Sequence, residues 1–199
     1  MRHQVNASVR QLRPTQISVA MARVAQARAQ IRGAVLRGQL QDFLTWRPLS
    51  GVLGPGGAVF VTDEHHIARA LADEGIETCI VVLHQDLSRV LPDRFWIAME
   101  RLGLVHPVDA AGRRRAFASI PRHLAQLEDD PYRYLALNVR DNGGSKEWEG
   151  CAAEIQWANF LRTQVPGQLL AGNESEALRV ALSHARSEAA RRLPGWKPA

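Results

Sequence analysis

The segment 47–83 constrains the fold most, because it holds three strand patterns and one helix in close succession. "RPLSGVL", "GPGG" and "AVFVTD" (47–63) predict strand, turn and strand, since Gly and Pro supply the dihedral angles of a tight connection. "EHHIARALADEG" (64–75) predicts a helix that ends at its glycine. "ETCIVVL" (77–83) predicts a strand buried on both faces, because its apolar residues are continuous. A small sheet that carries a helix is therefore expected.

The remaining segments predict an α+β chain, with strands early and helices dominating the second half. An early strand is expected over 7–13, where "ASVRQLR" roughly alternates before Pro14. Apolar residues at helical spacing predict a helix over 18–46, which Gly33 and Gly38 divide into pieces. The later helices are expected over 86–103, over 120–144 with a break at Asp130-Pro131, over 147–165 and over 173–193.

Two parts of the chain are expected to differ in organisation. The length of 199 residues suits one domain of ordinary size with an appended helix. We place that domain, with its helical extension, at 1–165. Pro166 and Gly167 then open a linker and a basic helix over 166–199, which either packs on the domain or projects from it.

The net charge of +5 hides an uneven distribution along the chain. Residues 1–41 contain seven arginines and no acid, and residues 179–199 contain five Lys or Arg and one acid, Glu188. The middle, 42–178, carries 13 basic and 19 acidic residues. Basic ends of this kind either meet nucleic acid or another polyanion, or form solvated helix faces.

The chain is expected to be cytoplasmic, with no membrane partner. No apolar run approaches the roughly 20 residues that a helix needs to cross a bilayer, and no segment of signal-peptide type opens the chain. The two cysteines, Cys79 and Cys151, show no metal-ligand spacing, so we expect both to be buried and reduced.

Four polar residues open the helix within "TDEHHIARAL" (62–71). Asp63 stands at the expected N-cap position, where its carboxylate would accept from the amide of His65 or His66. Free amides and the helix dipole make such an end attractive to an anion. The two imidazoles, with Arg69 one turn on, would add side-chain donors to a phosphate site.

Two other interpretations of this segment stay open. Glu64 opposes an anion, so its side chain is expected to turn away or to meet a metal ion. Adjacent histidines on a helix point about 100° apart, which disfavours a zinc ion bound by both. In the simplest interpretation, an N-cap and two polar surface residues precede a core-facing stripe formed by Ile67, Ala70 and Leu71.

Several motifs, taken in order, resemble the ParB-like nuclease family, a branch of the ParB/sulfiredoxin superfamily. The resemblance covers about 9–165. The motifs are "LRPTQ" (12–16), "VLGPGGAVFVTDEHHIARAL" (52–71), "FWIAM" (95–99), "DDPYRYLALNVRDNGG" (129–144) and "EIQWANFLR" (154–162). It implies a small mixed sheet packed with helices, followed by a largely helical C-terminal half.

The resemblance also implies phosphate chemistry. ParB proteins bind CTP and DNA, sulfiredoxins use ATP, and a free serine kinase with this fold uses ADP. In these relatives a strand-to-helix motif holds the nucleotide phosphates. Asp63, His65 and His66 match that motif and are the implied catalytic and phosphate-binding residues, with Arg69 beside them. The implied cofactor is ATP or ADP. A phosphoryl transfer at this site could also use Mg²⁺, which Asp63 would position together with Glu64 or, alternatively, Asp130.

The sequence departs from these relatives at three points. No cysteine lies near 62–69, which does not support sulfiredoxin chemistry. Ile67 stands where the kinase-like motif has an arginine. Gln16 matches the glutamate that suits the serine kinase as its base, and a glutamine cannot take a proton in that way.

A second family motif, 129–144, adds basic candidates. Arg133 and Arg140 lie seven residues apart, about two helical turns, so they can share one face and grip a polyphosphate. Lys146 follows a Gly pair and is a candidate phosphate contact. The carboxylates that could pair with the arginines instead are Asp129, Asp130 and Glu154.

Three functions follow from these observations. The first is an enzyme that binds a nucleotide or phosphoester and transfers a phosphoryl group to a small acceptor. The alternative is a ParB-like nuclease, or a nucleic-acid-binding module without catalysis. A third function is that of a degenerate family member that binds a small anion without catalysis. Gln16, at the position of the catalytic base, favours this third function. The expected partners are thus a nucleotide or another phosphate-containing small molecule, or nucleic acid.

Overall fold

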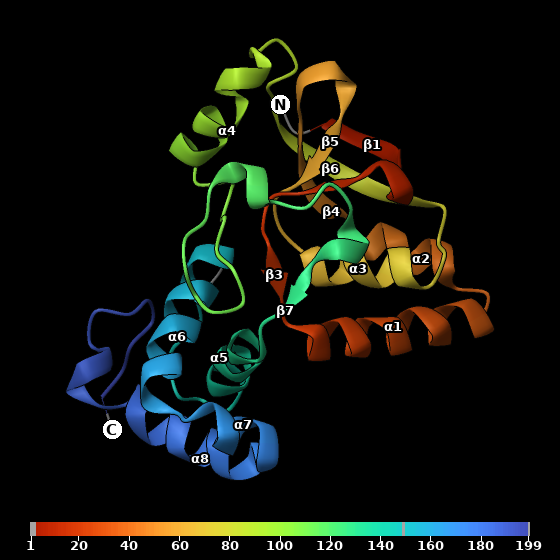
Figure 1. Cartoon of the computed structure of the whole chain (residues 1–199). Coiled ribbons are helices and arrows are strands. Elements are labelled where there is room, and N and C mark those ends of the chain that lie inside the picture. Colours follow the sequence, from red (N-terminus) through yellow and green to blue (C-terminus); the bar gives the residue numbers. More distant parts are fainter. Residues whose placement is uncertain (1–2, 149, 199) are drawn as a thin grey trace. The chain divides into compact units, whose positions relative to one another are not determined.

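The computed structural model describes residues 3–148 and 150–198 (Figure 1). The chain forms two compact units. Unit 1 comprises Met1–Asp109 and Arg113–Asp129, and unit 2 comprises Ala110–Gly112 and Asp130–Ala199. Unit 1 contains two buried hydrophobic clusters and unit 2 a third. The α+β class and the helical second half are confirmed.

The division falls at Asp130, whereas the sequence placed the end of the first domain at 165. The reason is that the helices before and after Val165 share one hydrophobic core. The segment 166–199 is therefore part of unit 2 and packs on the helices that precede it, as in the first of the two expected arrangements.

Unit 1 is built on a mixed five-stranded sheet in the order β1-β6-β4-β5-β2. Pairing is antiparallel for β1 with β6 and for β4 with β5, and parallel for β6 with β4 and for β5 with β2. The strands are β1 (His3–Ser8), β2 (Arg13–Pro14), β4 (Leu49–Leu53), β5 (Val59–Val61) and β6 (Thr78–Asp86). A separate parallel pair joins β3 (Ser18–Val19) to β7 (Glu128–Asp129).

The β4–β5 hairpin forms as the sequence predicted. Gly51 pairs with Val61 across it, and the turn between the strands is a short 3₁₀ segment, η2 (Pro55–Gly57). Gly56 takes a φ of +68°, a backbone conformation that residues with a side chain rarely adopt. The amide of Gly54 closes the turn by donating to the carbonyl of Ala58 at 2.8 Å.

Four α-helices complete unit 1. They are α1 (Met21–Leu36), α2 (Leu40–Trp46), α3 (His65–Asp73) and α4 (Pro92–Arg101). Gly33 lies inside α1, whereas Gly38, with a φ of +67°, separates α1 from α2. Helices α1 and α3 pack together on one side of the sheet (Figure 1). The apolar stripe of α3 is buried as predicted, at Ile67, Ala70 and Leu71.

Two predicted elements of unit 1 are wrong. The strand expected over 7–13 ends at Ser8, and a 3₁₀ turn, η1 (Val9–Gln11), separates it from β2. The helix expected from 120 is only a 3₁₀ turn, η4 (Leu124–Gln126), that leads into β7. Its buried apolar residues have helical spacing, but the amide of Glu128 bonds to Ile17 instead of to its own segment. Another 3₁₀ turn, η3 (Phe117–Ser119), precedes it.

Unit 2 is helical. Its elements are α5 (Pro131–Asp141), α6 (Cys151–Gln164), α7 (Gly167–Gly172), α8 (Glu174–Ala185) and the 3₁₀ turn η5 (Glu188–Ala190). Asn173 caps α8 by accepting from the amide of Glu176 at 3.0 Å, as the sequence predicted. A stripe of fully buried alanines in α8 lets it approach its neighbours closely: Ala177, Ala181 and Ala185. Trp157 fills the core and donates from Nε1 to the carbonyl of Pro194.

No helix within 3–148 and 150–198 combines the length and apolar character that crossing a bilayer requires. Cys79 lies buried in β6, where burial raises the pKa of its thiol to about 11. Cys151 is also a buried free thiol. The expected burial of both cysteines is confirmed.

We expect Gly51→Ala to destabilise unit 1. A Cβ at this position would lie 2.7 Å from the Val81 side chain and 3.0 Å from the Phe60 carbonyl, so the sheet must shift. Overpacking of this kind costs about 1–3 kcal/mol in the free energy of unfolding. Gly33→Ala is the matched control, since its Cβ meets only the flexible Arg37 side chain and a helical alanine gains about 0.5–1 kcal/mol. Urea titration of both variants measures the difference, and equal stabilities would contradict this packing.

Candidate functional site

The start of α3 is a strained corner between β5 and the helix. Glu64 has a φ of 59° and is the N-cap residue, and it is the one non-glycine with positive φ among the described residues. Asp63 was predicted to be the N-cap, and this is wrong. Its Oδ1 accepts from the adjacent amide of Glu64 at 2.8 Å instead of from the helix. Left-handed backbone at a non-glycine residue costs about 1–3 kcal/mol and is concentrated at functional sites.

His65 is buried and joins α3 to the segment that follows β2. Its Nε2 accepts from the backbone amide of Thr15 at 3.1 Å, and the Thr15 hydroxyl donates to the carbonyl of Val61 at 2.8 Å. A backbone amide is always a donor, so Nε2 carries no proton and Nδ1 does. The side-chain amide nitrogen of Gln16 lies against Nδ1. A protonated Nδ1 needs an acceptor, so we assign this amide the flipped orientation, in which its oxygen accepts from Nδ1. The geometry thus gives His65 and Gln16 a structural role, and their catalytic or binding role stays a prediction.

His66, the next residue of α3, is half-buried. Its Nε2 lies 3.4 Å from Oε2 of Glu64, so the Glu64 side chain turns toward an imidazole. Among the described residues no three or more His, Cys, Asp or Glu side chains gather into a metal site. Two carboxylates, at 63 and 64, still supply the ligand type that Mg²⁺ takes together with substrate phosphates. Metal binding there stays a prediction.

Arg69 is engaged by protein groups. Its Nε donates to Asp73 at 2.8 Å, and Nη1 donates to the carbonyls of Leu124 and Leu127 at 3.3 and 3.1 Å. Only 14% of the side chain is exposed. A phosphate at Arg69 would have to replace these contacts, which hold η4 against α3.

The basic candidates of the second motif lie in unit 2. Arg133 is buried and pairs with Glu154 at 2.6 Å, one of the pairings that the sequence left open. Burial alone lowers the pKa of Arg133. The neighbouring Glu154 and other negative groups raise the pKa by more than burial lowers it, so the net shift is upward. Arg140 bonds to Asp141 and covers the ring of Trp148 at 4.8 Å.

The other residues of that motif have structural contacts as well. Asp130 caps α5 by accepting from the amide of Tyr132, and its second oxygen accepts from Arg162 at 2.7 Å. Asp129, in unit 1, accepts from the amide of Met21 at 2.9 Å. Lys146 uses its backbone amide to reach the carbonyl of Gly195. Phosphate binding by Arg133, Arg140 and Lys146 stays a prediction.

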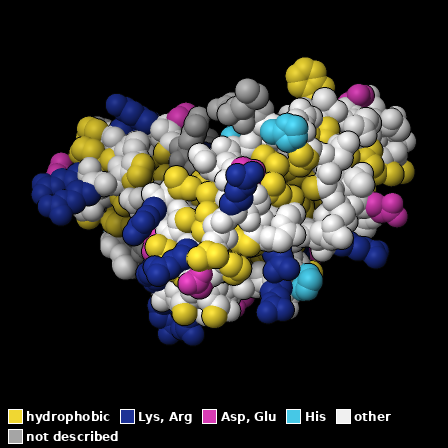
Figure 2. Space-filling model, turned by 90° about the horizontal axis from the view of Figure 1, so that it is seen from above, with side chains coloured by type: hydrophobic (Ala, Val, Ile, Leu, Met, Phe, Trp, Pro, Cys, Tyr) yellow, Lys and Arg dark blue, Asp and Glu magenta, His cyan; other side chains and the backbone are white. Residues whose placement is uncertain are grey.

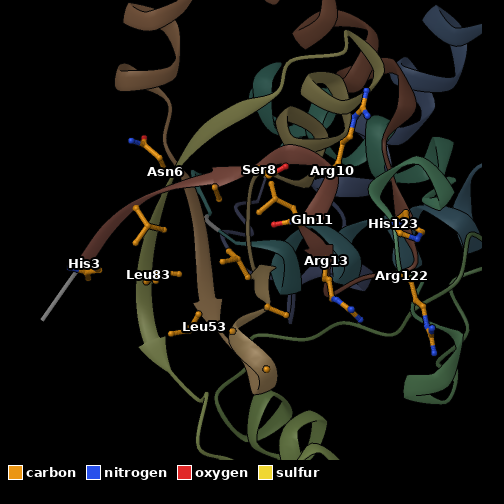
Figure 3. A pocket seen from close by; sticks show the side chains of 17 residues that line it. His3, Asn6, Ser8, Arg10, Gln11, Arg13, Leu53, Leu83, Arg122 and His123 are labelled. Carbon is orange, nitrogen blue, oxygen red and sulfur yellow. The ribbon is translucent and has the colours of Figure 1, made fainter.

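The sequence did not reveal the largest of the cavities that we describe, which lies in unit 1 (Figure 3). It measures about 870 Å³, in the range of ligand pockets. β1, η1, β2 and the β4–β5 turn form its wall, together with the residues just before η4. Its basic lining residues are His3, Arg10, Arg13, Arg122 and His123, and within 3–148 and 150–198 no Asp or Glu lines it. We call it the basic cavity.

The arginines of the basic cavity differ from those of the predicted sites. Arg10, Arg13 and Arg122 are exposed, and none of the three forms an ion pair or a side-chain hydrogen bond within the described part of the chain. Figure 3 shows the Arg13 and Arg122 side chains on the same side of the cavity, coming from separate segments. On the face shown in Figure 2, Lys and Arg side chains are spread out with apolar patches between them. Among the described residues, the lining of the cavity thus combines three arginines with no carboxylate.

Residues 5–163 match the family model described as "Putative ParB-like nuclease". The chain belongs to the ParB-like nuclease family. Its structure is similar to the "Crystal structure of protein Atu1540 from Agrobacterium tumefaciens", with 34% sequence identity and a TM-score of 0.91. That match covers 100% of this chain and 98% of the other. A search of curated proteins finds no match.

The family resemblance seen in the sequence is thus confirmed. In this ParB-like chain the motif "LRPTQ" serves both regions of unit 1. Arg13 lines the basic cavity, whereas Thr15 and Gln16 contact His65. One short segment therefore connects the start of α3 to the cavity.

The adjacent histidines provide a test of the bridge to α3. His65→Ala removes the acceptor of a buried backbone amide, and leaving such a donor unpaired costs about 1–3 kcal/mol, to which lost packing adds. His66→Ala is the matched control and should change the free energy of unfolding by less than about 0.5 kcal/mol. Urea titration of both variants decides, and equal losses would show that the Thr15–His65 bond contributes nothing special.

Proposed function

We propose that this ParB-like chain binds nucleic acid through the basic cavity of unit 1. The observation that carries the proposal is a concave surface with three exposed arginines, two histidines and no acid in its lining. A carboxylate in the lining would repel phosphate and pair with the arginines. Here the guanidiniums are available without breaking an ion pair.

The chemistry of the cavity suits a phosphodiester backbone. Arginine presents planar donors that match two phosphate oxygens at once, and its charge is permanent at physiological pH. Each phosphate neutralised by a cationic side chain releases a counterion, so such binding weakens steeply as salt rises. The family name, a ParB-like nuclease, agrees with a nucleic-acid ligand. Hydrolysis of that ligand is the enzymatic form of the same proposal.

A second proposal concerns the start of α3. The strained Glu64, with the half-buried His66 beside it, is the observation in its favour. There the chain would bind ATP or ADP with Mg²⁺, held by Asp63 and Glu64, and transfer a phosphoryl group to a small acceptor. It has less support, because Arg69 and His65 are engaged by protein groups.

The first proposal predicts that the double variant Arg13→Ala, Arg122→Ala loses affinity for nucleic acid. Two phosphate contacts disappear, so the slope of log affinity against log salt should fall by about 1.4 for single strands or 1.8 for duplex. Fluorescence anisotropy over a salt series measures both quantities. Arg37→Ala is the control, because Arg37 lies outside the cavity and bonds to Gln39. Wild-type slopes in the double variant would place the nucleic acid elsewhere.

The second proposal predicts a rise in melting temperature with nucleotide. A ligand at 100 times its Kd stabilises the folded state by about 2.7 kcal/mol. Thermal unfolding with ATP or ADP, with and without Mg²⁺, measures this effect. His66→Ala should remove the shift in melting temperature without loss of fold. Arg37→Ala is the control that should keep the shift, because Arg37 bonds to Gln39 and is not a candidate phosphate-binding residue. If no nucleotide shifts the wild-type melting temperature, the second proposal fails.

A further inference from the structure

Two smaller cavities in unit 1 share residues with the basic cavity. They measure about 300 and 230 Å³, and Arg13 lines both as well as the basic cavity. Arg122 lines the basic cavity and the 300 Å³ cavity. As in the basic cavity, the lining of each contains no Asp or Glu. Together the three cavities form a surface that continues from the arginines to a group of aromatic rings.

The aromatic rings are arranged in a buried and a half-buried layer. Phe60 and Phe95 are buried in the core, with ring centroids 4.5 Å apart. Trp96 packs edge-on against both of them, with centroid distances of 5.5 and 5.1 Å. On its other side Trp96 stacks on Phe117, at 6.1 Å and an interplanar angle of 17°. Core packing therefore fixes the orientation of the half-buried rings.

All four rings belong to one hydrophobic cluster, but Trp96 and Phe117 lie at its border and are only partly buried. Trp96 and Phe117 are half-buried, and both line the 300 Å³ cavity beside Arg13 and Arg122. The guanidinium of the exposed Arg114 lies over the Phe117 ring, 5.7 Å from its centroid, so a base entering this cavity would take the place of Arg114 on that ring. The base would then stack beside the unpaired Arg13 and Arg122, which could contact phosphates. This pair of features is the general recognition mode of single-stranded nucleic acid, in which bases stack on aromatic side chains while a basic groove follows the backbone.

We propose that unit 1 binds nucleic acid as a single strand, with phosphates at Arg13 and Arg122 and a base in the cavity lined by Trp96 and Phe117. This rests on the proposed function and names its ligand class. In a duplex the base faces are covered by neighbouring base pairs, so the aromatic rings gain no contact from it. A single strand has exposed base faces, and stacking tolerates any base, so the binding has little sequence preference.

The test compares three probes of equal length by fluorescence anisotropy at one salt concentration. They are single-stranded oligothymidylate, the same strand with abasic sites, and a duplex. The wild-type protein should bind oligothymidylate at least about 5-fold more tightly than the abasic strand, as expected for one stacked base. Arg13→Ala with Arg122→Ala should weaken the binding of all three probes.

The aromatic contribution is tested by Trp96→Leu and Phe117→Leu. Each should weaken the binding of oligothymidylate at least about 5-fold and leave the abasic strand within about 2-fold. Trp46→Leu is the matched control, because Trp46 is 84% exposed and lines none of the three cavities. Thermal unfolding checks the fold of each variant. If Trp96→Leu does not fold, Phe117→Leu and the wild-type comparison of the two strands decide.

The outcomes separate the two proposals. Equal wild-type affinity for oligothymidylate and the abasic strand, or tighter binding of the duplex, overturns the single-strand inference and leaves the proposed function standing. Unchanged oligothymidylate affinity in folded Phe117→Leu also overturns the inference. No binding of any probe by the wild-type protein overturns both proposals.

Discussion

The buried contact between His65 and Thr15 is the interaction on which unit 1 depends. It joins residues that lie 50 positions apart in the chain, just beyond the end of the parallel pair that β2 forms with β5. Through it the start of α3 is fixed against the residues that follow β2, and the same residues continue back to Arg13 at the basic cavity. Because a backbone amide donates to the ring, the tautomer of His65 is set by the fold.

The arginines fall into two groups, those that bond to protein groups and those whose donors stay available for a ligand. Arg69 and Arg133 looked like phosphate ligands in the sequence, but both donate to carboxylates and are largely buried. Arg133 forms an ion pair with Glu154 that joins α5 to α6. Arg13 and Arg122 were not among the site residues predicted from the sequence, although Arg13 lies in the motif "LRPTQ", yet they keep their donors available. Charge in a motif therefore indicates a ligand site only once its neighbours in space are known.

Local patterns predicted the hairpin, α3 and β6, because strand alternation, helical spacing and glycine placement are properties of short segments. These patterns failed for the segment from Ile120. Its apolar residues do have helical spacing, but the backbone at its end pairs with β3 as the strand β7 instead of continuing a helix. The basic cavity was not predictable from the sequence, because its lining residues come from distant segments. Whether an acid lies near them depends on the three-dimensional fold and not on the local sequence. The different roles of His65 and His66 were hidden for the same reason, as they depend on Thr15.

The contacts of Arg69 have a consequence for communication within unit 1. Its guanidinium holds the carbonyls of Leu124 and Leu127, which follow Arg122 closely in the chain. Any anion that withdrew Arg69 from these carbonyls would loosen the strip of backbone from which Arg122 reaches the cavity. Anion binding at the start of α3 would then weaken the binding of nucleic acid by Arg13 and Arg122. By thermodynamic reciprocity, a bound strand that immobilised Arg122 would lower the affinity for an anion at Arg69 by the same factor.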